Sequence, residues 1–144
     1  MLRRTVESDI EIDASPERVW NVLSDLPRHA DWDPFIRRIE GDLRQGGRLK
    51  VVLRLPDGRG MVLRPKVLTA DPGRQLRWLG HLGFPYLFDG EHSWTIEPLG
   101  DGKVRLVQQE NFRGLLVPLA GRTLAKTRQG FVGMNEALKR RAER

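Results

Sequence analysis

The chain has 144 residues, of which 39% are apolar and 31% are charged, so it is long enough for one folded domain with a sizeable core. It has no run of about 18 apolar residues, which excludes a membrane-spanning helix, and no cysteine, which excludes disulfide bonds, thiol nucleophiles and thiolate metal sites. Of the net charge of +6, +5 lies in residues 1–4 and 139–144, at chain ends that are usually solvated, so we expect no specific nucleic-acid partner. The first 13 residues lack the apolar core of a signal peptide, and we therefore expect a cytoplasmic protein.

The N-terminal region predicts one strand followed by two short helical segments. Residues 5–12 alternate between apolar and polar side chains, which predicts a strand with one buried face. Ser15 suits the N-cap of a helix and Pro16 suits its first turn, so we expect a helix over residues 16–23. Residues 28–35 then predict a turn or a second small helix.

The middle of the chain predicts a series of antiparallel strands. Residues 36–113 consist of short apolar stretches separated by turn residues, a pattern typical of a meander. Two three-residue loops, 56–58 and 100–102, end in glycine and fix the register of two hairpins. The second hairpin is predicted to pair Leu99 with Lys103, Ile96 with Leu106, Trp94 with Gln108 and His92 with Glu110. Because side chains alternate along a strand, the last two pairs are predicted to share the inward face with Phe112.

The C-terminal region predicts one long helix, which Pro118 opens and which runs to about residue 141. The apolar side of this helix has spacings of three and four residues: Leu124, Thr127, Phe131, Met134 and Leu138. Gly130 and Gly133 weaken the middle of the helix. They permit a bend or the close approach of another element, or they are a pair that the helix simply tolerates.

Seven short motifs follow one another along the chain in a characteristic order. They are IDASPERVW (12–20), LPR (26–28), WDPFI (32–36), GRL (47–49), PGRQLRW (72–78), FDGEH (88–92) and GFVGMNEALK (130–139). The series resembles the START-like proteins of the SRPBCC superfamily, and is most similar to the polyketide cyclase/dehydratase-like branch. The resemblance implies an α+β helix-grip fold, in which a curved antiparallel sheet of about seven strands wraps around a long C-terminal helix. Two short helices follow the first strand in this fold, and a single START-like ligand-binding domain is expected to span residues 1–144.

The resemblance also implies an interior cavity between the sheet and the last helix. Such a cavity binds a lipid, a polyketide or an aromatic compound, so the expected partner is a small hydrophobic ligand, with no cofactor and no metal. The entrance is expected near residues 31–35, residues 80–88 and the start of the last helix. Two alternatives stay open, namely a polyketide cyclase/dehydratase-type enzyme and a co-chaperone-like interaction module; a monomer and a homodimer are both compatible with the sequence.

Bulky or polar side chains on the predicted inward faces and near the entrance are the candidates for ligand binding. They are Trp32, Phe35, Trp78, Phe88, His92, Trp94, Gln108, Glu110, Phe112, Leu124 and Phe131. His92 and Glu110 are also the catalytic candidates, because a histidine beside a carboxylate supports proton transfer. The same pair is also interpreted as a polar anchor for a ligand, or as a structural pair that satisfies two buried groups, and the structural interpretation is favoured over the other two.

Other polar residues suggest a metal site only weakly. His29, Asp31 and Asp33 are close in sequence, but carboxylates beside a proline-containing turn more often cap that turn. His81 has no partner at a spacing typical of zinc ligands. No metal site is therefore predicted.

Overall fold

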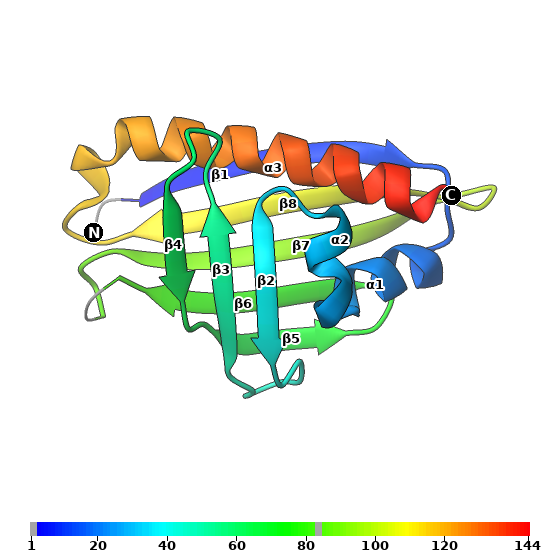
Figure 1. The fold of residues 1–144 in the computed structure, drawn as a ribbon, viewed down its shortest axis with the longest axis horizontal. Helices are drawn as coiled ribbons and strands as arrows, with labels where there is room; N and C mark the ends of the chain where they lie inside the picture. The colour runs from blue at the N-terminus through cyan, green and yellow to red at the C-terminus, as the bar shows by residue number, and fades with distance from the viewer. Residues whose placement is uncertain (1–2, 83–84) are drawn as a thin grey trace.

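The computed structural model describes residues 3–82 and 85–144, in which long strands curve around the C-terminal helix (Figure 1). In chain order the elements are β1 (Arg3–Ile12), α1 (Pro16–Ser24), η1 (Leu26–Arg28), α2 (His29–Trp32), β2 (Ile36–Gly41), β3 (Leu49–Arg54), β4 (Gly60–Leu63), β5 (Lys66–Asp71), β6 (Gln75–His81), β7 (Asp89–Gly100), β8 (Lys103–Arg113), η2 (Val117–Leu119) and α3 (Gly121–Ala142). No helix in these residues is long and apolar enough to cross a membrane.

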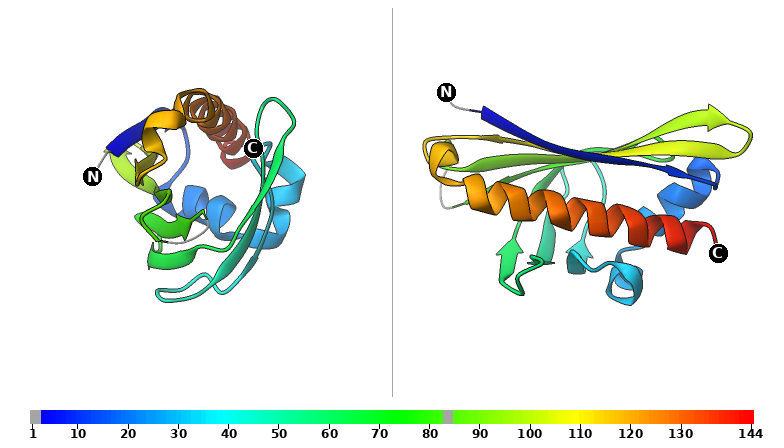
Figure 2. Two further views of the ribbon diagram at one scale, coloured as in Figure 1. Left: turned by 90° about the vertical axis from the view of Figure 1, so that its left-hand side faces the viewer. Right: turned by 90° about the horizontal axis from the view of Figure 1, so that it is seen from above.

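The strands form two antiparallel sheets that face a common interior. One sheet has five strands in the order β1-β8-β7-β6-β5, and the other has three in the order β2-β3-β4. Seen from its end, the molecule places both sheets and α3 around this interior (Figure 2). The helix-grip fold is thus confirmed, but the expected single meander is divided into two sheets, with eight strands in the described residues.

The first strand and the first helix form as predicted. In β1, Val6, Ser8 and Ile12 are buried while the residues next to them are exposed. The Ser15 hydroxyl caps α1 by accepting a hydrogen bond from the backbone N–H of Arg18 (3.1 Å). The capping signal therefore determines where α1 begins, whereas β1 already begins at Arg3, before the predicted residue 5.

The β3–β4 hairpin has the predicted three-residue loop. The backbone N–H of Leu55 donates to the carbonyl oxygen of Arg59 (2.9 Å), and Gly58 adopts the left-handed conformation at φ +89°. This loop keeps Val51, Leu53, Met61 and Leu63 on the same face of the sheet, as predicted.

The β7–β8 hairpin has the predicted register but a different turn. Asp101 and Gly102 are both left-handed, at φ 54° and 73°, so they form a two-residue turn of the type that matches strand twist. Gly100 pairs with Lys103, and Leu99 is the extra residue of a bulge. The predicted pairing of Leu99 with Lys103 is therefore wrong. The inserted residue compensates for the shorter turn, which leaves the pairs farther along the ladder as predicted.

The last helix begins at Gly121 instead of at Pro118. Pro118 lies in the short helix η2, and Ala120, at φ −101° and ψ 12°, separates η2 from α3. The buried face of α3 includes all five predicted residues: Leu124, Thr127, Phe131, Met134 and Leu138.

The end of α3 is part of the folded body. The Arg18 guanidinium donates to the carbonyl oxygens of Ala142 (3.2 Å) and Arg141 (3.1 Å), two acceptors that a helix C-terminus leaves unpaired. Ala142 is buried, and at the other end of the chain Arg3 already belongs to β1. The prediction that the basic residues at both ends lie on solvated tails is therefore wrong.

A buried contact between a histidine and a carboxylate fixes the connection between α1 and β2. His29 contacts Asp33 through Nδ1 (2.9 Å) and the carbonyl oxygen of Leu23 through Nε2 (2.7 Å). The other carboxylate oxygen of Asp33 accepts from the backbone N–H of Phe35 (2.9 Å) and from the next residue. Asp33 thus caps the turn, whereas Asp31 is exposed at the surface.

Gly130 lies where α3 crosses Phe35. A Cβ at position 130 would lie 2.5 Å from Phe35 Cδ1, whereas a Cβ at position 133 would be 3.9 Å from Pro34 Cγ. We expect Gly130→Ala to lower the free energy of unfolding by about 1–3 kcal/mol, because the Phe35 ring must move. The matched variant Gly133→Ala should raise it by about 0.5–1 kcal/mol through helix propensity. Urea denaturation measures both values, and effects of equal size and sign would contradict the close approach at Gly130.

Candidate functional site

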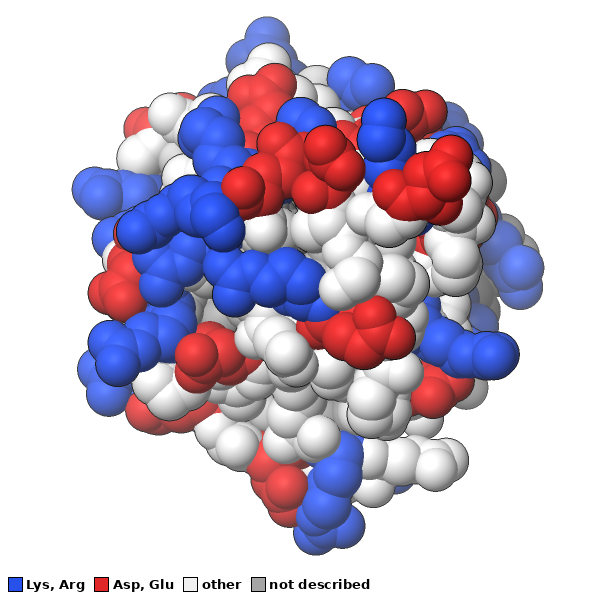
Figure 3. Space-filling view, turned by 90° about the vertical axis from the view of Figure 1, so that its right-hand side faces the viewer, with Lys and Arg blue, Asp and Glu red and all other residues white. Residues whose placement is uncertain are grey.

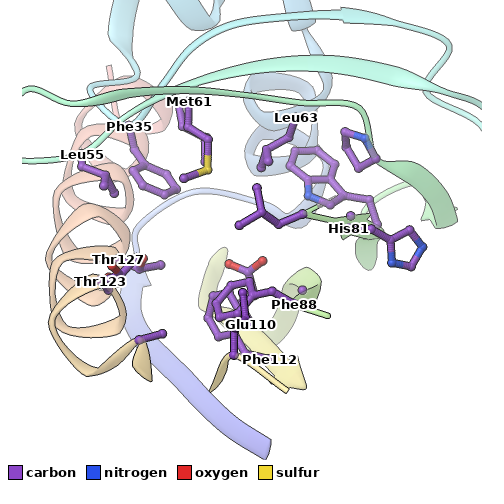
Figure 4. A pocket seen from close by; sticks show the side chains of 18 of the residues that line it. Phe35, Leu55, Met61, Leu63, His81, Phe88, Glu110, Phe112, Thr123 and Thr127 are labelled. Atoms are coloured by element: carbon purple, nitrogen blue, oxygen red, sulfur yellow. The ribbon is translucent and has the colours of Figure 1, made fainter. Parts of the chain in front are cut away.

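A mostly apolar cavity of about 340 Å³ lies between the concave face of the five-stranded sheet, the β3–β4 hairpin and the start of α3 (Figure 4). Its lining residues are Phe35, Leu53, Leu55, Met61, Leu63, Pro65, Trp78, Gly80, His81, Leu82, Phe88, Gly90, Glu110, Phe112, Leu116, Leu119, Ala120, Thr123 and Thr127. Among these residues, Glu110 and His81 carry the ionisable side chains.

The β3–β4 hairpin supplies a wall of the cavity that the sequence analysis did not assign to any site. Leu53 pairs with Met61, and both side chains line the cavity, whereas Val62 is half exposed on the opposite face. The tip of the hairpin is held to α3 by an ion pair between Lys126 Nζ and Asp57 Oδ2 (2.7 Å). The predicted alternation of apolar residues in this hairpin was the signal that could have identified the wall.

The structure divides the predicted site residues into two groups. Five line the cavity: Phe35, Trp78, Phe88, Glu110 and Phe112. Six do not: Trp32, His92, Trp94, Gln108, Leu124 and Phe131. Trp32 packs against His29 on α2, with ring centroids 4.8 Å apart, and Leu124 is buried in α3. The other four lie in the buried core beside Glu110. Of the predicted entrance segment 80–88, Gly80, His81, Leu82 and Phe88 line the cavity, and Gly83 and Phe84 lie outside the described residues.

The carboxyl group of Glu110 faces the cavity (Figure 4). Only 13% of its side chain is exposed, and the nearest ionisable neighbour is His92, whose Nδ1 lies 3.7 Å from Glu110 Oε1. Gly90, on the neighbouring strand, leaves the space that the second carboxyl oxygen occupies, because a Cβ there would collide with it. Burial raises the pKa of Glu110 to about 8. Near neutral pH the group is therefore mainly a protonated carboxylic acid, which can donate as well as accept a hydrogen bond.

A chain of buried hydrogen bonds connects His92 to the backbone of β1. The Ser8 carbonyl oxygen accepts from Asn135 Nδ2 (3.2 Å), and Asn135 Oδ1 accepts from Gln108 Nε2 (2.8 Å). Gln108 Oε1 lies 2.9 Å from His92 Nε2. Because a backbone carbonyl can only accept, each amide in this relay has a single possible orientation. His92 therefore donates through Nε2, and its Nδ1 keeps a lone pair on the side of Glu110.

His92 is held as a neutral base behind the cavity wall. Its ring stacks on Trp94 at a centroid distance of 3.9 Å and contacts Phe131 at 4.7 Å. Burial lowers the pKa of His92 to about 3, although its hydrogen bond with Gln108 acts in the opposite direction. The predicted pair of His92 and Glu110 thus exists as cross-strand neighbours, but the hydrogen-bond partner of His92 is Gln108. At neutral pH the proton of the pair belongs to Glu110.

The second ionisable residue, His81, has a partner that the sequence analysis missed. His81 Nδ1 lies 2.7 Å from Asp89 Oδ1, and the same carboxylate accepts from the backbone N–H of Tyr86 (3.1 Å). The imidazole ring points away from the cavity (Figure 4). Asp89 therefore organises the β6–β7 loop. Within residues 3–82 and 85–144, no three His, Asp or Glu side chains gather as a metal-ligand set.

Comparisons with known proteins agree with this architecture. The model of a family described as polyketide cyclase/dehydrase and lipid transport matches residues 3–143. The Zhui aromatase/cyclase from Streptomyces sp. R1128 is 22% identical, with a TM-score of 0.80 over 99% of this chain and 95% of that chain. Norcoclaurine synthase from Thalictrum flavum, in complex with dopamine and hydroxybenzaldehyde, is 13% identical, with a TM-score of 0.72 over 96% and 86%. Ara h 8.0201 is 17% identical, with a TM-score of 0.72 over 98% of both chains. A sequence comparison with curated proteins finds no match.

Proposed function

Since the chain belongs to the polyketide cyclase/dehydrase and lipid transport family, we propose that it binds a small uncharged hydrophobic molecule that carries one polar oxygen or nitrogen. The observation that supports this function is the buried carboxyl group of Glu110, whose pKa burial raises, on the wall of an otherwise apolar cavity. Hydrophobic ligand sites typically combine apolar walls with a few polar groups that fix orientation. In this proposal Glu110 is the polar anchor, and His92 lies behind it in the core, with Nδ1 3.7 Å from Glu110 Oε1.

The cavity favours a ligand of modest size. Its volume of about 340 Å³ is at the lower end of the range for small-molecule sites, roughly 300–1,000 Å³. A molecule of two or three rings, or a short acyl chain, fits this volume. The hydroxyl of Thr127 donates to the Thr123 carbonyl oxygen (2.8 Å), so it is already engaged within the helix.

The protonated anchor also favours a neutral ligand over an anion. A carboxylate or sulfonate beside Glu110 would be buried without a cation, which is costly in an apolar site. A carbonyl, hydroxyl or arylamine group can exchange a hydrogen bond with the neutral carboxyl group instead. Uncharged ligands are therefore the proposed class.

Two related dyes test the cavity and its charge preference. N-phenyl-1-naphthylamine is uncharged, and 8-anilinonaphthalene-1-sulfonate has the same ring skeleton with one added sulfonate. At pH 6.5 we expect the neutral dye to bind at least about tenfold more tightly, because the sulfonate would be desolvated without a partner. Fluorescence titration gives both dissociation constants. Equal affinities, or tighter binding of the sulfonate, would contradict the proposed class.

A variant pair in the hairpin locates the binding. Met61→Trp should weaken binding of the neutral dye at least about tenfold, because the larger side chain fills cavity volume. Val62→Trp places the same side chain on the exposed face of the same strand, where we expect little change. If both variants bind the dye as the wild type does, the dye is bound elsewhere.

A second candidate function is acid catalysis, which the juxtaposition of Glu110 and His92 favours. A protonated carboxyl group can donate its proton to a departing hydroxyl group, which leaves as water when the C–O bond breaks, and the resulting carboxylate can take the α-hydrogen of the substrate as a proton while the C=C bond forms. Loss of water from a hydrophobic β-hydroxy ketone with the wild type, but not with Glu110→Gln, would identify an enzyme.

The co-chaperone alternative needs an apolar patch on the outer face of the sheet, and in the described residues only Val62 and Leu99 are large, apolar and exposed away from the cavity mouth. The cytoplasmic location, the lack of a nucleic-acid partner and the single-domain organisation stay predictions.

A further inference from the structure

The exposed apolar residues gather at one end of the molecule. Seven large apolar side chains are exposed in the described residues, and five of them lie on two adjoining segments at the cavity mouth. These five, which we call the apolar rim, are Leu82 and Tyr86 between β6 and β7, and Leu115, Leu116 and Leu119 between β8 and α3. Leu115 and Leu119 are 77% and 83% exposed. A cluster of this kind marks an interaction surface more often than isolated exposed residues do.

Backbone hydrogen bonds join the two segments of the apolar rim. The N–H of Leu115 donates to the carbonyl oxygen of Tyr86 (3.2 Å), and the N–H of Leu116 donates to that of Leu87 (3.1 Å). Gly114, at φ +134°, brings its backbone so close to Leu87 that a Cβ would lie 2.5 Å from the Leu87 carbonyl oxygen. The two segments therefore hold the exposed leucines side by side.

The apolar rim continues into the cavity. Leu82, Leu116 and Leu119 are exposed to solvent and also line the cavity wall. A hydrophobic molecule that enters or leaves at this mouth therefore contacts apolar side chains along its path.

Basic residues are in excess beside the apolar rim, although Lys126 contacts Asp57 and Arg113 contacts Asp89. No acidic residue occurs between Asn111 and Asn135, a stretch that contains Arg113, Arg122, Lys126 and Arg128. Arg3 begins the strand β1 beside Arg113, and among the described residues neither Arg3 nor Arg122 has a salt-bridge partner. The opposite end of the molecule presents acidic and basic side chains intermixed (Figure 3). The apolar rim and an excess of positive charge thus coincide at the mouth.

We propose that this end of the protein docks on an anionic membrane surface, with the apolar rim inserted among the lipids and the arginines at the phosphates. Protruding leucines, a tyrosine and surrounding basic residues are the features by which peripheral proteins bind such surfaces. An acidic protein would match the charge but would leave the protruding leucines without a complementary groove. Docking in this orientation connects the cavity to the bilayer, so a hydrophobic ligand passes between them without crossing water.

Co-sedimentation with vesicles tests the apolar rim. We expect the full chain to bind vesicles of phosphatidylcholine with 30% phosphatidylglycerol at low salt, and to bind pure phosphatidylcholine vesicles much more weakly. Leu115→Glu should lower the partition coefficient at least about tenfold, because it removes an inserted apolar side chain and adds a repelled charge. Leu99→Glu, at the far tip of the β7–β8 hairpin, makes the same change in an exposed leucine and should lower it far less. Neutral-dye binding should be unchanged in both variants, since neither residue lines the cavity.

A second variant pair tests the basic residues. Arg122→Gln should lower the partition coefficient about fivefold. Arg140→Gln gives the same net charge but lies at the opposite end of α3, so it should lower the partition coefficient less. Absence of binding to the anionic vesicles, or equal losses from Leu99→Glu and Leu115→Glu, would overturn the proposal. The proposal would also be overturned if Leu115→Glu bound the anionic vesicles as the wild type does and both proteins bound equally well to a polyanion such as heparin. That result would assign the binding to charge alone.

Discussion

Replacement of Glu110 by glutamine is expected to raise the free energy of unfolding at pH 8 by about 2–4 kcal/mol and to leave it nearly unchanged at pH 4.5. Burial raises the pKa of this carboxyl group from its ordinary value of 4.5 to about 8. Between these values the folded chain keeps a proton that the unfolded chain releases, so the stability of the wild type falls as the pH rises. Glutamine has a similar shape and does not titrate, so the variant lacks this loss. The open cavity admits water, which keeps the effect below the full value of the shift.

His92 contributes a pH dependence of the opposite sign. Burial lowers its pKa from 6.5 to about 3, so the stability that comes from neutral His92 is present above pH 6.5 and is lost as the pH falls toward 3. Between pH 4.5 and pH 6.5 the effects of His92 and Glu110 oppose each other. The contribution of this pair should therefore be nearly constant in that interval and should decrease on both sides of it.

Urea denaturation between pH 4 and pH 9 measures these effects. The informative quantity is the difference between the wild type and Glu110→Gln at each pH, because other titrating groups cancel. Glu7→Gln, an exposed position on β1, serves as the matched control and should follow the wild type. A constant difference across the range would show that Glu110 is ionised in the folded protein at neutral pH and would remove the basis for its role as a neutral anchor.

Gln108→Leu is expected to lower the free energy of unfolding by about 3–5 kcal/mol. The amide of Gln108 joins His92 to Asn135, so its loss leaves a buried N–H of the histidine and a buried amide oxygen without partners. Gln109→Leu is the matched control, because Gln109 occupies the next position in β8 and its side chain points to the other face. We expect a change of less than about 1 kcal/mol for this control.

A double variant distinguishes the relay from simple packing. If the residues act as one network, the double variant Gln108→Leu/Asn135→Leu should lose clearly less free energy of unfolding than the sum of the losses in the two single variants. Strict additivity, or an equal loss from Gln109→Leu, would contradict the relay.

The parts of the fold that the sequence predicts well are those that local signals determine. Ser15 fixes the start of α1, and the alternation along β7 and β8 places His92 opposite Glu110. The turn between these strands was predicted wrongly at Leu99, yet the register is right because burial on one face tolerates only shifts that preserve alternation. The turn type alone therefore predicts the wrong pairing beside the bulge at Leu99, whereas the pattern of burial predicts the right pairing along the rest of the two strands.

The site is harder to predict because a cavity wall and a packed core share the same sequence pattern. Trp94 and Phe112 both point inward, but Trp94 is fully buried in the core while Phe112 lines the cavity. The difference depends on how far each residue lies along the curved sheet and on the position of the β3–β4 hairpin. The relay has no local signal either, since Ser8 and Asn135 are brought together only by the packing of α3 on β1.

The relay also determines which positions are free to vary during evolution. Ser8 takes part through its backbone carbonyl oxygen, which any residue supplies, so its side chain can change to others of similar size without altering the chemistry of the cavity wall. Gln108 and Asn135 must each donate and accept, and an amide side chain does so with two separate groups, one toward each neighbour. The backbone carbonyl oxygen of Ser8 in β1 therefore determines, through the relay, which nitrogen of His92 carries the proton. In homologous sequences, positions 108 and 135 should therefore both keep an amide or both lose it, whereas position 8 should drift.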